Sequence, residues 1–204
     1  MSEEAAFVPA EMGPREAYRL LASLVVPRPI GWISTISPDG VPNLAPYSFF
    51  NGVGAYPPTV MFSAGQRLGP KDTLRNARET GEFVVNIVSD DLAGAMNLTA
   101  GDWPYEVSEF DAAGLAAAPC IDVKPPRVAS ARAALECRVT QIVPVEGTHY
   151  TAVFGRVVRF HVRADLLRPD GLVDPERLQP VGRLGGDAYA RLGEVFEMPR
   201  PTVR

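Results

Sequence analysis

Two cations, a carboxylate and a hydroxyl gather at the start of a short predicted helix. Residues 67–83 read RLGPKDTLRNARETGEF, which places Arg67, Lys71, Asp72 and Thr73 at the opening of a helix predicted over 73–80 and ended by Gly81. A helix N-terminus has unsatisfied N–H groups and a partial positive charge, so it accepts phosphate readily. The segment therefore binds an anion, or Asp72 caps the helix and the cations are solvated. Spacing alone favours the second interpretation.

A second polar group lies in a strand broken by prolines. Residues 41–53 read VPNLAPYSFFNGV, and Asn43, Tyr47, Ser48 and Asn51 stand among small and aromatic residues. Proline cannot donate to a sheet, so this predicted strand is an edge or leaves some partner groups free. Outward-facing backbone groups suit a flat, amide-edged ring such as a flavin. The alternative is a twisted strand with ordinary turn residues.

A tryptophan and a threonine mark a third segment. Residues 30–37, IGWISTIS, are β-branched and aromatic and predict a strand. Trp32 and Thr35 are three positions apart, an odd spacing, so they point to opposite faces of that strand. Core packing of Trp32 is the favoured interpretation without other information.

Composition and charge exclude several classes of function. The chain has 204 residues, is 46% hydrophobic and 22% charged, and carries a net charge of -4. The chain lacks the excess of basic residues that would indicate binding to nucleic acid or to an anionic membrane surface. The longest apolar run, over 20–26, is too short to span a bilayer, and the acidic Glu3, Glu4 and Glu11 precede it. We therefore expect no signal peptide and a cytoplasmic location.

The cysteines and histidines predict no metal site. Cys120 and Cys137 match no metal-ligand spacing, and His149 and His161 cannot form a histidine-rich site on their own. Two reduced thiols in a cytoplasmic protein are the simpler interpretation.

The remaining pattern indicates short antiparallel strands with a few helices. Twenty prolines and eighteen glycines punctuate the chain. Helices are predicted over 14–24 and 90–100, and an irregular stretch over 100–127. Strands are predicted over 59–65, 82–88, 127–145 and 149–162, the last two joined by a hairpin at Gly147. In the first long strand, Ala131, Ala133, Leu135, Cys137 and Val139 alternate with more polar neighbours. A small closed barrel, which has no free edges, fits this order better than βαβ units.

Several segments together resemble one known family. They are PRPIGWISTISPDGVPNLAPYSFFNGVGAYPP (27–58), KDTLRN (71–76), GEFVVN (81–86), EFDAAGLAAAPCIDVKPPRVASARAALEC (109–137) and HYTAVFGRVV (149–158). In this order they are similar to the flavin reductase-like, FMN-binding split-barrel family that includes flavoredoxin. PVGRLGGDAYARLGEVFEMPRP (180–201) is similar to the C-terminal extension of some members.

The resemblance implies a mainly β fold: a six-stranded antiparallel split β-barrel with flanking helices. It implies one domain over 1–204, with a core over about 14–165 and an extension over 166–204. It also implies a homodimer with FMN near the subunit interface, and NADH or NADPH as the reductant.

Carried over residue by residue, the resemblance implies three groups of cofactor-binding residues. The phosphate end would be formed by Arg67, Lys71, Asp72 and Thr73. The flavin ring and its ribityl chain would be lined by Trp32, Ser34, Thr35, Asn43, Ala45, Pro46, Tyr47, Ser48 and Asn51. His149 would approach the cofactor from a late strand, although a surface histidine at a hairpin is almost as well supported. Arg183 and Tyr189 would close over the site or serve the tail alone.

The implied activity is hydride transfer from a nicotinamide to FMN, which needs no catalytic side chain because the cofactor supplies the chemistry. A flavin-binding electron carrier or flavin store fits the same residues, since no nicotinamide motif is identifiable. A dimeric interaction module that has lost its ligand is a third alternative. The strand APYSFFNGVG (45–54) departs from the Ser/Thr-rich strand of the reductases that serve two-component monooxygenases. That departure argues against assigning a monooxygenase partner.

Overall fold

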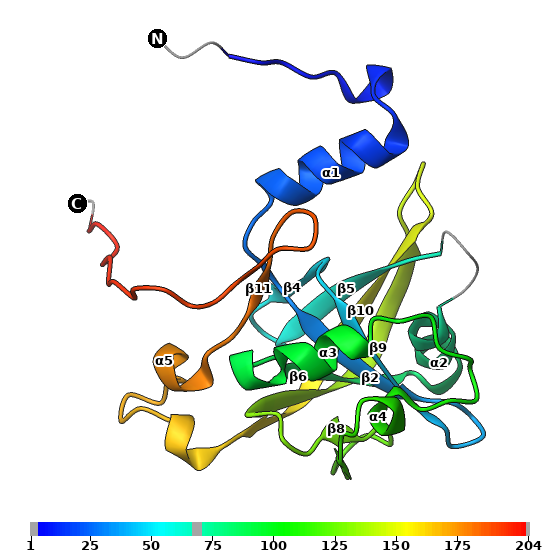
Figure 1. Cartoon of the computed structure of the whole chain (residues 1–204). Helices are drawn as coiled ribbons and strands as arrows, with labels where there is room; N and C mark the ends of the chain where they lie inside the picture. Colours follow the sequence, from blue (N-terminus) through cyan, green and yellow to red (C-terminus); the bar gives the residue numbers. More distant parts are fainter. Residues whose placement is uncertain (1–3, 67–70, 203–204) are drawn as a thin grey trace.

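The computed structural model describes residues 4–66 and 71–202. Short helices flank a large antiparallel sheet (Figure 1). The helical elements are η1 (Pro9–Glu11), α1 (Pro14–Leu24), α2 (Asp72–Thr80), η2 (Asp90–Leu92), α3 (Ala93–Leu98), α4 (Glu109–Ala112), η3 (Ala164–Leu166) and α5 (Pro175–Leu178). The strands of the main sheet are β2 (Gly31–Ile36), β3 (Pro42–Tyr47), β4 (Phe50–Gly54), β5 (Thr59–Gly65), β6 (Glu82–Ile87), β9 (Ala133–Pro144) and β10 (Tyr150–Val162). Smaller pairings involve β1 (Arg28–Pro29), β7 (Ala117–Ala118), β8 (Arg127–Val128), β11 (Gly182–Arg183) and β12 (Tyr189–Ala190).

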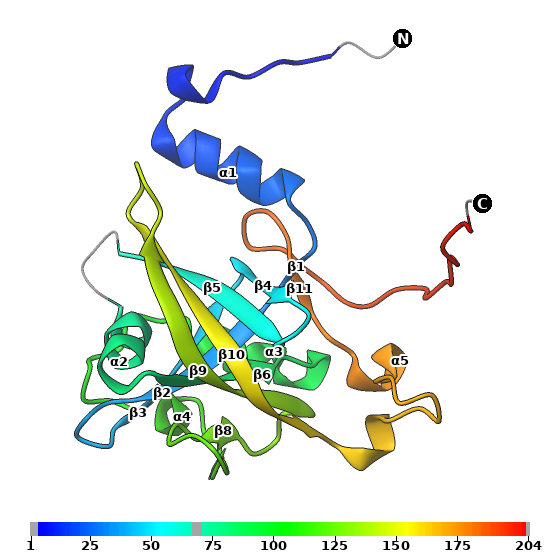
Figure 2. The same cartoon turned by 180° about the vertical axis from the view of Figure 1, so that it is seen from behind.

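The main sheet has seven strands in the order β3-β2-β6-β9-β10-β5-β4. The single strand predicted over 41–53 is wrong, because the chain turns at Ser48 and Phe49 and its two halves become the end strands of the sheet. This split also explains why the main sheet has one strand more than the six expected. Since β3 and β4 are consecutive in the chain, the two ends of the sheet meet there, and the sheet curls into a split barrel (Figure 2).

The barrel interior is packed with aromatic and aliphatic side chains. Phe62 and Phe83 are fully buried and meet edge to face with ring centroids 5.3 Å apart. Helix α2 adds Leu74 and Ala77 to this cluster. Gly155 on β10 leaves room for the ring of Phe83, which a Cβ atom at that position would strike. This close approach explains a glycine in the middle of a long strand.

A second cluster covers the outer face of β2 and β3. Trp32 is fully buried there with Leu44, Met96 and Phe110, beneath α3 and α4. Thr35 instead bonds with Asn76 of α2, so the prediction that Trp32 and Thr35 point to opposite faces is confirmed. The predicted core role of Trp32 is also confirmed.

The alternation predicted in the first long strand holds for one face only. Leu135, Cys137 and Val139 face the barrel interior as expected. Ala134 and Glu136 are buried as well, because the loop that contains Val123 packs over the outer face of β6 and β9.

Helix α1 stands apart from the barrel, and only Ala22 of it is buried (Figure 1). Tyr18, Leu21 and Leu24 expose 50%, 51% and 72% of their surface. Arg28 fastens the end of this helix, since its guanidinium donates to the carbonyls of Ala22, Val25 (2.7 Å) and Leu184 (2.9 Å). Among the described residues, no helix combines the length and apolarity needed to cross a bilayer.

Candidate functional site

A cavity of about 540 Å³ lies between edge strand β3, the start of α2 and the segment after α3. It is lined by predicted site residues from two separate segments: Asn43, Ala45, Pro46, Tyr47, Lys71, Asp72 and Thr73. The opposite wall consists of Thr99, Ala100, Gly101, Asp102, Trp103, Tyr105 and Glu109. The fold therefore brings the two polar segments singled out in the sequence to one place.

Helix α2 presents its N-terminus to this cavity without a side-chain cap. Lys71 is the N-cap residue, in extended conformation, and its carbonyl accepts from the N–H groups of Leu74 and Arg75. The interpretation in which Asp72 caps the helix is wrong, because Asp72 is the first helical residue, and among the described residues no side-chain cap hydrogen bond is made at this end. The first turn of α2 therefore keeps its partial positive charge toward the cavity.

Edge strand β3 presents mainly acceptors. Among the described strands it pairs only with β2. The N–H of Leu44 faces away from the sheet and donates to Glu109 Oε2 at 2.9 Å. The same orientation recurs two residues later at Pro46, which has no N–H group. The outward row thus offers carbonyl oxygens, and hydrogen-bond donors for a ligand must come from side chains or from α2.

A buried polar network supports the cavity floor. With its amide oxygen toward the hydroxyls of Thr73 (2.9 Å) and Thr35 (3.3 Å), the NH2 group of Asn43 faces Glu109 Oε1 at 3.2 Å. Thr35 also accepts from Asn76 of α2 at 3.1 Å. Strands β2 and β3 are thereby bonded to α2, which fixes the relative position of the two polar segments that line the cavity.

Three ionisable groups on the cavity wall have perturbed acidity. Burial raises the pKa of Glu109, and the nearby Asp72 carboxylate adds to the rise. Burial likewise raises the pKa of Asp72, while the neighbouring Lys71 opposes the rise. The pKa of Tyr47 is raised far above its ordinary range, chiefly by burial. These side chains therefore resist ionisation at the cavity floor. Among the described lining residues the cation at the mouth is Lys71, whose Nζ lies 2.8 Å from the Asp102 carboxylate.

The aromatic wall was not predicted as part of the site. Trp103 and Tyr105 line the cavity, and the guanidinium of Arg75 lies 4.2 Å from the centroid of the Tyr105 ring. Tyr105 also donates to Asn76 at 3.0 Å. The signal available in the sequence was a pair of aromatic residues, in DWPYE, inside an otherwise irregular stretch.

The other predicted residues do not line the cavity. Trp32, Ser34 and Thr35 are fully buried in the sheet, and the Trp32 indole donates to Thr99 at 2.8 Å. Ser48 accepts from Arg28, and Asn51 is exposed on β4. Arg67 lies outside the described residues.

His149 and the C-terminal pair are also elsewhere. His149 is exposed at the β9–β10 hairpin, against the ring of Tyr150. Arg183 donates to the hydroxyl of Tyr189, and that hydroxyl lies 3.4 Å from Asn97 of α3. These two residues bind the tail to itself and to α3 rather than lining the cavity.

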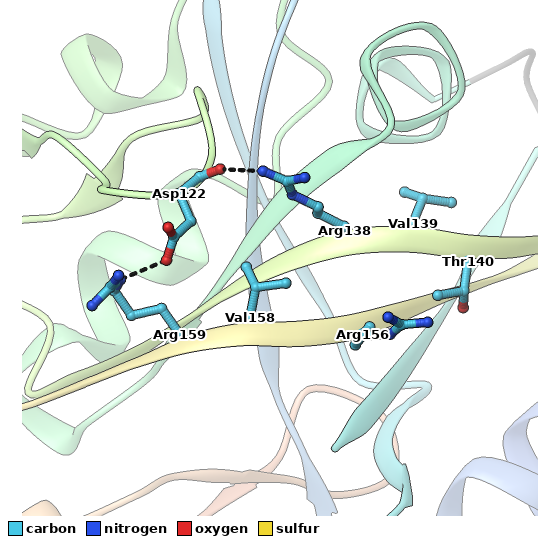
Figure 3. A pocket seen from close by; sticks show the side chains of 7 residues that line it. All are labelled: Asp122, Arg138, Val139, Thr140, Arg156, Val158 and Arg159. Atoms are coloured by element: carbon cyan, nitrogen blue, oxygen red, sulfur yellow. Dashed lines mark hydrogen bonds and ion pairs between the residues drawn. The ribbon is translucent and has the colours of Figure 1, made fainter. Parts of the chain in front are cut away.

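A second hollow of about 630 Å³ lies on the outer face of β9 and β10 (Figure 3). Its charged side chains largely satisfy one another: Arg159 contacts the Asp122 carboxylate at 2.6 Å, and Arg138 donates to the Asp122 carbonyl. None of the described residues that line it is aromatic or belongs to a helix N-terminus. The cavity beside β3 is therefore the stronger candidate site.

The curled antiparallel sheet, with a cavity beside its edge strand, defines a split barrel of the flavin-reductase kind. Residues 23–181 match the family described as flavin reductase like domain. The chain belongs to this family.

Relatives cover almost the whole chain. An uncharacterized protein of Halalkalibacterium halodurans is 42% identical over 201 residues, which is 96% of each chain. Nitrilotriacetate monooxygenase component B from Bacillus cereus has a similar structure, with a TM-score of 0.94, 37% identity and coverage of 97% of this chain and 100% of that one. The 2-nitrobenzoate 2-nitroreductase of Pseudomonas fluorescens superposes with a TM-score of 0.88, 31% identity and 97% coverage of both chains.

The residues of the cavity fit the flavin that the family implies. The volume falls within the range of about 300–1,000 Å³ usual for small-molecule and cofactor sites. An uncapped helix N-terminus with an adjacent ammonium suits a phosphate. Carbonyl oxygens along β3 suit a ring N–H, and flat aromatic side chains stand opposite them.

Proposed function

We propose that the protein binds FMN in the cavity beside β3 and transfers hydride equivalents from NADH or NADPH to flavin. The observation that carries the proposal is the meeting of the α2 N-terminus and edge strand β3 in one cavity. Membership of the flavin reductase-like family supports flavin as the ligand.

In this proposal the phosphate binds at the N-terminus of α2. The ammonium of Lys71 and the first N–H groups of the helix are its donors, because the Thr73 hydroxyl already donates to the amide oxygen of Asn43. The ring system lies along Ala45 and Pro46, and Trp103 lines the facing wall. Lys71 is the only lysine or arginine among the described lining residues, so it is the cation that this part of the cavity offers to an anion.

Bound flavin supplies hydride-accepting chemistry, so the chain needs no nucleophile or paired general acid and base. The protein must hold the ring in one orientation and leave one face open to a nicotinamide. The network from Asn43 to Asn76 serves this purpose by fixing β3 against α2. Glu109 braces the same strand through the N–H of Leu44.

The relatives suggest two classes of electron acceptor to test. Component B of nitrilotriacetate monooxygenase points to reduced flavin delivered to a second protein, and the nitroreductase points to a nitroaromatic acid. The sequence departure over 45–54 argues against a monooxygenase partner, yet a component of such a system is 37% identical. Free flavin and a nitroaromatic acid are therefore both included as acceptors.

Steady-state oxidation of NADH and of NADPH, with FMN present and then with 2-nitrobenzoate added, tests the proposed function. We expect one reductant to be consumed faster than in a sample of FMN alone. An FMN-loaded protein that consumes neither reductant would favour the electron carrier or flavin store. A protein that does not bind FMN would favour an interaction module.

A further inference from the structure

Three side chains with metal-binding atoms meet on the outer face of the sheet, away from the cavity. Cys120 lies in the loop after β7, Glu136 on β9 and His161 on β10. The Cys120 thiol, a Glu136 carboxylate oxygen and a His161 ring nitrogen all lie within 4.8 Å of one another. The nearest pair, His161 Nε2 and Glu136 Oε1, is 2.5 Å apart.

Glu136 is held in one orientation by the backbone. Its Oε1 accepts from the N–H of Ile121 at 2.9 Å, and its Oε2 accepts from those of Asp122 (2.6 Å) and Val123 (3.1 Å). The residue is fully buried. A buried carboxylate is costly unless a cation or several hydrogen bonds compensate it, and its ion-pair partner among the described residues is a histidine that is neutral unless protonated.

We propose that Cys120, Glu136 and His161 bind a divalent transition-metal ion, and that zinc is the ion their ligand set favours. Thiolate sulfur, imidazole nitrogen and carboxylate oxygen are the ligand atoms of protein zinc sites. The ion takes the place of the proton between His161 and Glu136, and the ring moves outward to make room. The backbone bonds to Glu136 then serve as the outer hydrogen bonds that orient a ligating carboxylate.

The surroundings permit entry of an ion and shield it on one side. The His161 side chain is 21% exposed and Cys120 is half-buried, which leaves an approach from solvent and room for a water molecule as fourth ligand. Val84, Val123 and Ala134 pack against Cys120 on the inner side.

Such an ion would clamp the loop over 119–128 to the β9–β10 hairpin. The same loop already contacts the sheet elsewhere, because Ser34 donates to the carbonyl of Pro126 and Val128 donates to Asn86 at 2.8 Å. The clamp would join β2, β6, β9 and β10 through one segment. The site therefore has a structural role in this proposal, independent of the flavin cavity.

Zinc titration by calorimetry tests the site in the full chain after chelator treatment and dialysis. The variants are Cys120→Ser and His161→Gln. The matched controls are Cys137→Ala and His149→Gln. Cys137 is the other cysteine of the chain and lies in the barrel core, and His149 is the exposed histidine of the hairpin. Circular dichroism of each variant confirms folding.

We expect one zinc ion per chain in the unaltered protein and both controls, and affinity at least about tenfold weaker in Cys120→Ser and His161→Gln. Cobalt substitution should give the visible bands of a tetrahedral site with a thiolate ligand, and those bands should be absent from Cys120→Ser. Zinc binding that is undetectable in the unaltered protein, or unchanged in both site variants, would overturn the proposal and leave a hydrogen-bonded structural cluster.

Discussion

Lys71 and Asp102 face each other across the mouth of the cavity, with Nζ of Lys71 2.8 Å from the Asp102 carboxylate. Their side chains are 47% and 75% exposed, so water screens the pair and it contributes little to stability. A phosphate that binds to Lys71 can therefore displace Asp102 at a small cost in free energy. The pair orients the ammonium at the mouth of the cavity.

The first prediction concerns Lys71. Lys71→Ala should weaken FMN binding by about tenfold to a hundredfold, because it removes a charge-assisted hydrogen bond to the phosphate. Quenching of FMN fluorescence on titration with protein measures the affinity. Arg138→Ala is the matched control, since Arg138 lies in the hollow on the outer face of β9 and β10 and should leave the affinity unchanged.

Asp102, the ion-pair partner of Lys71, should have the opposite effect on FMN affinity in the same titration. Asp102→Asn removes the competing carboxylate, so FMN should bind with unchanged affinity or about two- to fivefold more tightly. If Asp102→Asn weakened binding as much as Lys71→Ala, the ion pair itself would be needed for the site and the phosphate assignment would fail.

The second prediction concerns pH. The pKa of Glu109 in the folded protein is raised, so above its ordinary value of 4.5 the folded state binds more protons than the unfolded state. Stability should then fall as pH rises through that range. Glu109→Gln removes this dependence, while Asp72, whose pKa is raised in the same direction, stays in both proteins.

Urea unfolding from about pH 4 to about pH 8 measures this effect. The free energy of unfolding of the unaltered protein should decrease relative to that of Glu109→Gln as pH increases. A difference between the two proteins that does not change with pH would contradict a raised pKa at Glu109.

The third prediction concerns the barrel interior. Gly155→Ala would place a Cβ atom against the buried ring of Phe83, and overpacking of this kind costs about 1–3 kcal/mol. Gly52→Ala, where no atom lies within 4 Å of the added Cβ, should change the free energy of unfolding by less than about 0.5 kcal/mol. Urea unfolding of both variants makes the comparison, and equal effects would show that the barrel accommodates the extra methyl group.

The fourth prediction concerns assembly, which we propose is a homodimer. Helix α1 exposes Tyr18, Leu21 and Leu24, and an exposed apolar helix face of this kind is typical of an interface. Light scattering should give a mass twice that of the 22.0 kDa chain. Leu24→Asp should reduce the mass to that of one chain, whereas Leu172→Asp, at a leucine 60% exposed on another loop, should not. A mass of one chain for the unaltered protein would contradict the proposal.

Much of the fold follows from local pattern in the sequence. The helix at Pro14–Leu24, a helix over 73–80 within Asp72–Thr80, and the hairpin between β9 and β10 were predicted. An edge was one of the two alternatives predicted for the strand with prolines, and β3 has that position. The break at Ser48 and Phe49 was not predicted, because strand propensity continues through β3 and β4. The pairing of β4 with β5 is what separates these two strands. Burial of Glu136 on the outward face was also not predictable, since a distant loop covers it.

The candidate site was predictable where its residues form compact motifs. Lys71, Asp72 and Thr73 are adjacent in sequence and line the cavity together. Trp103, Tyr105 and Glu109 were missed because they come from an irregular stretch that acquires its position only through contacts with β3 and α2. Spacing in the sequence could not identify the cluster of Cys120, Glu136 and His161 either, since three separate elements bring these residues together.

A crystal structure of the protein with FMN bound tests the central claim most directly. We predict that the phosphate lies within hydrogen-bonding distance of Lys71 Nζ and of the first backbone N–H groups of α2, with the ring along Ala45 and Pro46. FMN bound in the hollow beside Arg138 and Arg159, or no FMN at saturating concentration, would contradict the account.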